Sequence, residues 1–282
     1  MPIREKGYYK WSGTLQNSRV RWLPIFFVGI KNIYRKKFSK LFFTSFASMF
    51  FIFLLALYAS SKPELKMLSR LVSIIRTDNM LFRSFYTNGY MIFMSAILCL
   101  FAGSELISSD LKHNSVSLYL SRPLKKSDYI AGKYSIILFY LLLFSLLPGL
   151  LLIIFKIIFT GDISAGPSLL IKSFVFPIVI SFFWSSLILM FSSLSENARF
   201  VKLVFFILYF FSDFIAKVFF NVFNNGRFLY LSIEKNIKQF GSFVFGTKAE
   251  FNAPEWISGL ILISLTVVFI TVLYFRMKKV EV

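Results

Sequence analysis

The side chains that could carry chemistry are few, and those closest to a nucleotide-binding pattern do not complete it. An ATPase holds phosphate with a glycine-rich turn followed by lysine and a hydroxyl, G-x-x-x-x-G-K-[ST]. Residues 241–248 read GSFVFGTK, with threonine in the place of the lysine. Gly132 and Lys133 form another Gly-Lys pair, but the upstream glycine and the following hydroxyl are missing. We therefore expect this chain to bind no cofactor and to hydrolyse no nucleotide.

Residues of other catalytic sites are equally sparse. The single histidine, His113, excludes paired haem ligands and the H-E-x-x-H zinc helix. The single cysteine, Cys99, lies in an apolar run, which excludes an internal disulfide and a cysteine-based metal site. Intramembrane proteolysis would need a nucleophile with a base, or two aspartates, on adjoining apolar segments, and neither arrangement occurs. The sequence thus predicts neither an enzyme nor a metal site.

Asp213 and Lys217 are charged residues inside an otherwise apolar stretch, residues 200–222. Their i, i+4 spacing places them on one face of a helix, where pairing lowers the cost of holding them at membrane depth. Two interpretations remain open. The pair either lines a translocation path or acts as a structural tie near the end of a helix.

The elements that must position these residues are membrane helices. The chain is 57% hydrophobic, contains 38 phenylalanines and has a mean hydropathy of +0.70, more apolar surface than a soluble globule of this size can hide. A helix crosses the hydrocarbon core with about 20 apolar residues. Five stretches of this length carry no charge, and a sixth contains Asp213 and Lys217. The sequence predicts six spans, at residues 41–60, 84–104, 134–155, 173–195, about 200–222, and 256–275.

A polar loop, residues 104–133, separates the second and third spans. Glu105, Asp110 and Lys112 are expected to prolong the second span. Asn114 or Ser115 can then cap a short helix over residues 116–121. This short helix would lie across the membrane surface.

The second half of this loop predicts a turn and a new helix. Pro123 cannot continue the short helix, and it pushes Arg122 out of the helical region. Ser127 is the expected cap of the third span, with Asp128 favourably placed at the positive end of its dipole.

This loop resembles the first cytoplasmic loop of the permeases of type-2 ABC (ATP-binding cassette) exporters. The pattern is an acidic residue ending a span, a small polar residue, L-x-x-x-L-S-x-P, basic residues and D-Y-x-x-G-K. The matching residues are Glu105, Ile107, Ser108, Asp110, Ser115, Leu118, Leu120, Ser121, Arg122, Pro123, Lys126, Asp128, Tyr129, Gly132 and Lys133. At the cap position Ser115 stands where the family usually has threonine, which keeps the hydroxyl.

The resemblance implies a role for the loop. Residues 115–121 would be the coupling helix, which docks in a groove of a separate ATPase subunit. Leu118, Tyr119 and Leu120 would fill that groove, with Asn114, Ser115, Ser121 and Pro123 shaping the helix. Glu105, Asp110, Arg122 and Asp128 would set the polar register around it. ATP and magnesium are then expected on the partner, in an assembly of two ATPases and two permeases.

The amino-terminal part precedes the first span. Residues 1–16 are polar and lack the pattern of a signal peptide. Over residues 19–40, Trp22, Phe26, Ile30 and Ile33 recur at helical spacing opposite basic residues. This pattern predicts an amphipathic helix in the cytoplasmic interface, as the resembled family has; the alternative is a basic linker that only orients the first span.

The basic residues indicate the orientation. The net charge of +19 does not predict nucleic-acid binding, because lysines and arginines flank apolar spans and do not form one basic face. Of 32 basic residues, 20 fall on the side of the amino terminus: ten before the first span, five in the polar loop, two after the fourth span and three in the tail. The positive-inside rule therefore favours cytoplasmic termini and a cytoplasmic loop 104–133.

The longest outer connection is residues 212–255. Its start, FIAKVFFNVF at residues 214–223, is apolar enough to re-enter the membrane, like the re-entrant helices of type-2 permeases. The alternative is an ordinary surface loop with one interfacial helix.

The prediction is an all-α integral membrane protein of the cytoplasmic (inner) membrane. Residues 1–40 form a cytoplasmic segment with an interfacial helix, residues 41–275 a six-span permease domain, and residues 276–282 a cytoplasmic tail. Its expected function is that of an ABC exporter permease. The alternatives are a secondary transporter and a membrane scaffold that anchors a cytosolic partner.

Overall fold

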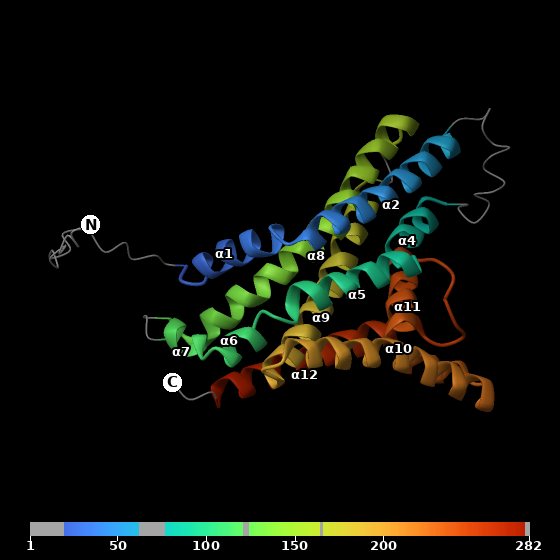
Figure 1. Cartoon of the computed structure of the whole chain (residues 1–282). Helices are drawn as coiled ribbons and strands as arrows, with labels where there is room; N and C mark the ends of the chain where they lie inside the picture. Colours follow the sequence, from blue (N-terminus) through green and yellow to red (C-terminus); the bar gives the residue numbers. More distant parts are fainter. Residues whose placement is uncertain (1–19, 62–76, 121–123, 164–165, 280–282) are drawn as a thin grey trace, which may run out of the picture.

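The computed structural model of the chain describes residues 20–61, 77–120, 124–163 and 166–279, which are helical over most of their length and contain no strand. Six helical segments, with residues 78–112 taken together, are long and apolar enough to cross a membrane. This confirms the predicted class and the six spans. The helices are α1 (Leu23–Tyr34), α2 (Lys37–Ser61), α4 (Asp78–Thr87), α5 (Gly89–Gly103), α6 (Ser108–Lys112), α7 (Ser115–Leu120), α8 (Lys126–Thr160), α9 (Gly166–Leu194), α10 (Ala198–Phe223), the 3-10 helix η2 (Gly226–Leu231), α11 (Ile233–Phe245) and α12 (Glu255–Lys278) (Figure 1).

Helix α1 is shorter than the helix expected over residues 19–40, because the chain leaves the helix at Arg35 and begins α2 at Lys37. Pro24 lies in its first turn, where its fixed φ suits the start of a helix. The buried residues Ile25 and Ile33 face α8, and Tyr140 of α8 donates a hydrogen bond to the carbonyl of Ile30 at 2.9 Å. The amino-terminal segment is therefore a packed helix and not only a linker.

The second span is interrupted, where a continuous helix over residues 84–104 was expected. It begins earlier, at Asp78, and breaks at Asn88, whose backbone takes an extended ψ of 135°. The Asn88 Oδ1 atom accepts a hydrogen bond from the Tyr90 amide at 2.9 Å and so caps α5. Asparagine favours such a break because its side chain can replace a helical backbone partner.

Helices α8 and α9 form the centre of the bundle. Gly149 of α8 and the turn at Pro177 of α9 both lie against Tyr86 of α4. A Cβ atom at position 149 would lie 1.7 Å from the Tyr86 hydroxyl, so only glycine lets α8 approach α4 there. Pro177 cannot donate to the Ser173 carbonyl, and the Tyr86 hydroxyl donates to that oxygen instead, at 3.4 Å. A cavity of about 20 Å³ also lies beside Pro177.

The connection between the last two spans differs from both expectations. Residues 214–223 are not a separate segment; they continue α10 as far as Phe223, where Asn224 ends the helix with a φ of 48°. The returning helix is α11, which packs against α4, α9 and α12 with Ile237 and Phe245 fully buried (Figure 1). Buried Gln239 holds the following loop: its Oε1 accepts from the amides of Glu250 and Phe251, at 2.8 and 3.2 Å.

Candidate functional site

The polar loop lies at one end of the bundle, beside the start of α1 and the end of α12 (Figure 1). Lys126 donates a hydrogen bond to the Lys278 carbonyl at 3.1 Å, which places the carboxyl end of α12 next to the start of α8. The second span does not continue through the loop as expected. Helix α5 ends at Gly103, a turn follows, and Ser108–Lys112 form the separate helix α6.

That turn is fastened to α9 by one buried hydroxyl. Ser192 Oγ accepts hydrogen bonds from the amides of Ile107 and Ser108, at 3.1 and 3.0 Å, and donates to the Ser104 carbonyl at 3.0 Å. Ser104, Ser108 and Ser192 are fully buried. A serine in an apolar span gave no sequence signal of this role beyond close helix packing.

Asp110 joins the two sides of the loop. Its Oδ2 atom lies 2.7 Å from Lys133 Nζ and accepts a hydrogen bond from the Tyr129 hydroxyl, also at 2.7 Å. The Lys133 ammonium lies 5.5 Å from the centre of the Tyr119 ring and 5.4 Å from that of Tyr129. These contacts connect α6, α7 and α8 through one nearly buried cation.

Helix α7 is the short helix predicted from the sequence, and it begins one residue earlier than expected, at Ser115. Asn114 precedes it with a left-handed φ of 51°, and the Ser117 hydroxyl donates to the Asn114 carbonyl at 2.6 Å. Val116 is buried, whereas the Leu118 side chain is 70% exposed. Ser121, Arg122 and Pro123 lie outside the described residues.

The third span begins at a different residue from the one expected. Helix α8 starts at Lys126 with Lys125 as its cap, so Ser127 is already inside it. Asp128 stabilises this start, because its Oδ2 atom accepts a hydrogen bond from the Lys125 amide at 3.2 Å.

Glu105 lies in the turn after α5 and binds two lysines from other parts of the chain. Its Oε2 atom is 2.6 Å from Lys36 Nζ, between α1 and α2, and its Oε1 atom is 2.8 Å from Lys202 Nζ in α10. This carboxylate therefore contacts one end of each of two further spans.

Asp213 and Lys217 form the expected ion pair, with 2.6 Å between Oδ2 and Nζ. Asp213 Oδ1 also accepts a hydrogen bond from the Ser232 hydroxyl at 2.9 Å, and Ser232 caps α11 by accepting from the Lys235 amide. These contacts tie α10 to the start of α11. The pair thus lies in α10 beside the start of α11, apart from the polar loop. The polar loop contains the other predicted site residues that the structure describes: Glu105, Asp110, Asn114, Ser115, Leu118, Tyr119, Leu120 and Asp128.

Comparison with known families decides what kind of membrane protein this is. Residues 26–282 match the family model described as "ABC-2 family transporter protein". This chain belongs to the ABC-2 transporter family. No curated protein matches it.

Membership in the ABC-2 family identifies the chain as a membrane subunit of an ABC transporter, whose ATPase is a separate partner. The match covers all six spans of the ABC-2 chain and its polar loop. Among the described residues of the ABC-2 chain, no three histidine, cysteine, aspartate or glutamate side chains come together as a metal site.

Proposed function

We propose that this ABC-2 chain is the permease subunit of an exporter, and that a cytosolic ABC ATPase docks on helix α7. The observation that supports docking most directly is the two-sided character of α7. Val116 and Tyr119 face the chain itself, whereas Leu118 presents a large apolar side chain to the outside at the end of a membrane bundle. Exposed leucine on a short surface helix is suited to a groove in a partner protein.

The contacts of α7 explain how docking would do mechanical work. Tyr119 packs on Tyr129, with 5.5 Å between ring centres, and both rings lie against the Lys133 ammonium. Asp110 links the same cation to α6. A displacement of α7 would therefore carry the start of α8. The Ser192 hydrogen bonds would pass the same movement from the turn after α5 to α9.

The site residues divide into two groups under this proposal. Leu118 contacts the ATPase, together with Leu120 and with Ser121, Arg122 and Pro123, which lie outside the described residues. Glu105, Asp110 and Asp128 bind other parts of their own chain, so they position the loop instead of facing the partner. Tyr119 joins both groups, because it connects α7 to α8.

The assembly proposed for transport contains two permease chains and two ATPases, with ATP and magnesium bound by the ATPases. Six spans are half of the usual pathway, so a second copy or a related permease completes it. The cytoplasmic membrane is the proposed location, with both termini in the cytosol. Two features support this orientation: the bias in basic residues, and the proximity of the start of α8, which follows the polar loop, to the end of α12 through Lys126 and Lys278.

Family membership favours this function over a secondary transporter, which would work without an ATPase. A scaffold that anchors an ATPase without transport fits the same docking surface, and ATP-dependent cargo movement in vesicles separates the two.

The test is Leu118→Asp in the chain co-expressed with an ABC ATPase from the same genome. We expect the ATPase to be lost from the purified complex while the permease still inserts, because a carboxylate in an apolar groove is costly to desolvate. Tyr119 is left intact, since its replacement would also disturb α8. Leu118→Met and Leu194→Asp are the controls: the first keeps an apolar side chain, and the second adds the same charge at an exposed leucine outside the loop. Full retention of the ATPase by Leu118→Asp would rule out docking on α7.

A further inference from the structure

We propose that Glu105 is a positioning residue that holds the inner ends of α2 and α10 and passes the movement of the coupling loop to both. This inference deepens the proposed function and rests on it for the part that involves ATP. We call the two ion pairs of Glu105, with Lys36 and with Lys202, the clamp.

The two oxygens of this carboxylate have different partners. Lys36 lies at the break between α1 and α2, 69 residues before Glu105, and Lys202 lies 97 residues after it, in the first turns of α10. Figure 1 shows α5 between α2 and α10, and Glu105, in the turn that follows α5, contacts Lys36 beside the start of α2 and Lys202 of α10. A single residue at the end of α5 thus contacts two further spans at their inner ends.

Glu105 projects from a well-fixed base. The turn that carries it is bound to α9 by Ser192, and Ser104 and Ile107 on either side are fully buried. Glu105 itself keeps 42% of its side chain exposed, which leaves it able to reach outward. The carboxylate is therefore attached to the central helices, and the lysines belong to the outer ones.

The two spans that Glu105 contacts, α2 and α10, are less buried within the chain than α9, to which its turn is bound. In their most apolar windows, 28% of α2 and 17% of α10 is buried, against 61% of α9. A span with little buried surface depends more on its few specific contacts for its position. Loss of one clamp is therefore expected to move α2 and α10 without unfolding the centre of the bundle.

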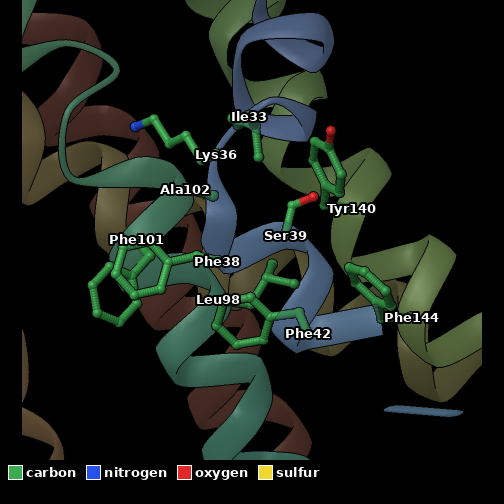
Figure 2. A pocket seen from close by; sticks show the side chains of 10 residues that line it. All are labelled: Ile33, Lys36, Phe38, Ser39, Phe42, Leu98, Phe101, Ala102, Tyr140 and Phe144. Atoms are coloured by element: carbon green, nitrogen blue, oxygen red, sulfur yellow. The ribbon is translucent and has the colours of Figure 1, made fainter. Parts of the chain in front are cut away.

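The packing beside the Glu105 contacts is incomplete. Phe38 of α2 stacks on Phe101 of α5, with 4.3 Å between ring centres. The Lys202 ammonium also lies over the Phe101 ring, 5.6 Å from its centre. Behind these rings a cavity of about 20 Å³ remains between the α1–α2 corner, α5 and α8 (Figure 2). A void of this size holds about one water molecule, so the side chains at this corner do not fill the space between them.

The two ion pairs of Glu105 are weak enough to adjust during a conformational change. Lys36 and Glu105 are each about 40% exposed, and Lys202 is 28% exposed. Partly exposed pairs of this kind are weak enough to lengthen and re-form. Because both lysines share one carboxylate, a displacement of the turn acts on α2 and α10 together.

The experiment measures the distance between the inner ends of these two spans in one chain. In a Cys99→Ser background, cysteines replace Leu41 of α2 and Leu203 of α10, which are 63% and 55% exposed, and carry spin labels. Doubly labelled chain is diluted with unlabelled chain in lipid nanodiscs, so that electron–electron distances report within one copy. Without nucleotide we expect one narrow distribution, which Glu105→Gln widens about twofold as α2 and α10 sample more positions.

Glu196→Gln is the matched control. It removes one carboxylate charge from the exposed turn between α9 and α10, near the start of the same span, and must leave the distribution narrow. Lys36→Gln and Lys202→Gln are each expected to give part of the widening, and they decide the question if Glu105→Gln inserts poorly. A distribution as narrow in all three variants as in the control would overturn the clamp.

A second arm adds the ATPase and ATP. The wild-type distance should shift, while Glu105→Gln retains the ATPase but shows less than about half of that shift. An equal shift in the variant would overturn the transmission role. Failure of the wild-type chain to bind any ATPase would instead contradict the proposed function, and the nucleotide-free comparison would still decide the clamp.

Discussion

Lys133 and Asp110 form a nearly buried ion pair, with 2.7 Å between Nζ and Oδ2 and side chains that are 8% and 16% exposed. The two residues lie on opposite sides of the polar loop, in α8 and α6. The Tyr129 hydroxyl donates to the same carboxylate oxygen. A buried pair of this kind specifies one arrangement of the loop, because neither charge is satisfied if the two sides separate.

Lys133→Met is therefore predicted to destabilise the chain strongly. It leaves the Asp110 carboxylate buried without its cation, which typically costs about 3–5 kcal/mol. Thermal unfolding in detergent measures the loss. Lys133→Arg keeps a cation at this place and should lose less.

The double variant Asp110→Asn, Lys133→Met tests the reason for this loss. With both charges removed, it should recover a large part of the stability lost by Lys133→Met, because coupled residues are not additive. Additive losses would show that the two side chains act independently and that packing alone explains the effect.

Much of this fold could be predicted because spans have a strong signal. Long uncharged runs between charges fix the number and order of the helices. The break at Asn88 was missed, since one asparagine in an apolar run gives little warning that its side chain will cap a new helix. The sequence placed the possible re-entrant helix of this connection at residues 214–223 and not over α11, because Asn236 and Gln239 make α11 resemble a surface helix and its burial depends on partners that the fold supplies.

The candidate site was less accessible from sequence. Asp213 and Lys217 are four residues apart, so their pairing could be predicted and is confirmed. Glu105 finds its partners 69 and 97 residues away, and no local pattern specifies such contacts. Short-range capping was only partly predictable. Asp128 stabilises the start of α8 as expected, but the helix is capped by Lys125 and not by Ser127.

Gly149→Ala is predicted to disturb the packing of α8 on α4. The added methyl group would lie 1.7 Å from the Tyr86 hydroxyl and 2.6 Å from Cζ, so the Tyr86 side chain or one of the two helices must shift. Overpacking of this kind costs about 1–3 kcal/mol. The melting temperature of the purified permease reports the loss.

Tyr86→Phe, Gly149→Ala is the corresponding double variant. Removal of the hydroxyl relieves the closest contact, so the double variant should be more stable than the sum of the single losses predicts. Strictly additive behaviour would mean that Gly149 is needed for a reason other than Tyr86.

Gln239→Leu is predicted to loosen the connection between α11 and α12. The side-chain amide is fully buried, accepts from the amides of Glu250 and Phe251, and donates to the carbonyl of Ala253 at 2.8 Å. Leucine has a similar size but leaves these backbone groups unsatisfied, at about 1–3 kcal/mol for each buried group. We expect a lower melting temperature and faster proteolysis of residues 246–254, whereas Asn252→Ala, at an exposed position of the same loop, should change neither.

Glu250 makes stability depend on acid pH in a defined direction. Burial would raise the pKa of its carboxyl, but the hydrogen bond from Lys235 and the charges of Lys235, Lys238 and Arg83 outweigh burial and hold that pKa below its usual value. The Glu250 oxygens lie 3.2 Å from Lys235 Nζ and 3.0 Å from Arg83 Nη2. The carboxylate thus joins α4 to α11 while it is ionised.

A carboxyl with a lower pKa in the folded state stabilises the fold above its unfolded pKa of about 4.3, and this contribution is lost as the pH falls from there through the folded pKa. We therefore expect wild type to exceed Glu250→Gln in melting temperature by a constant margin above about pH 5 and by a shrinking margin below about pH 4.3. Comparing the two proteins isolates this group from the other acids, since all of them titrate in both. A margin that stays the same from neutral pH down to the acid limit of folding would show that the ion pairs of Glu250 contribute nothing to the attachment of α11.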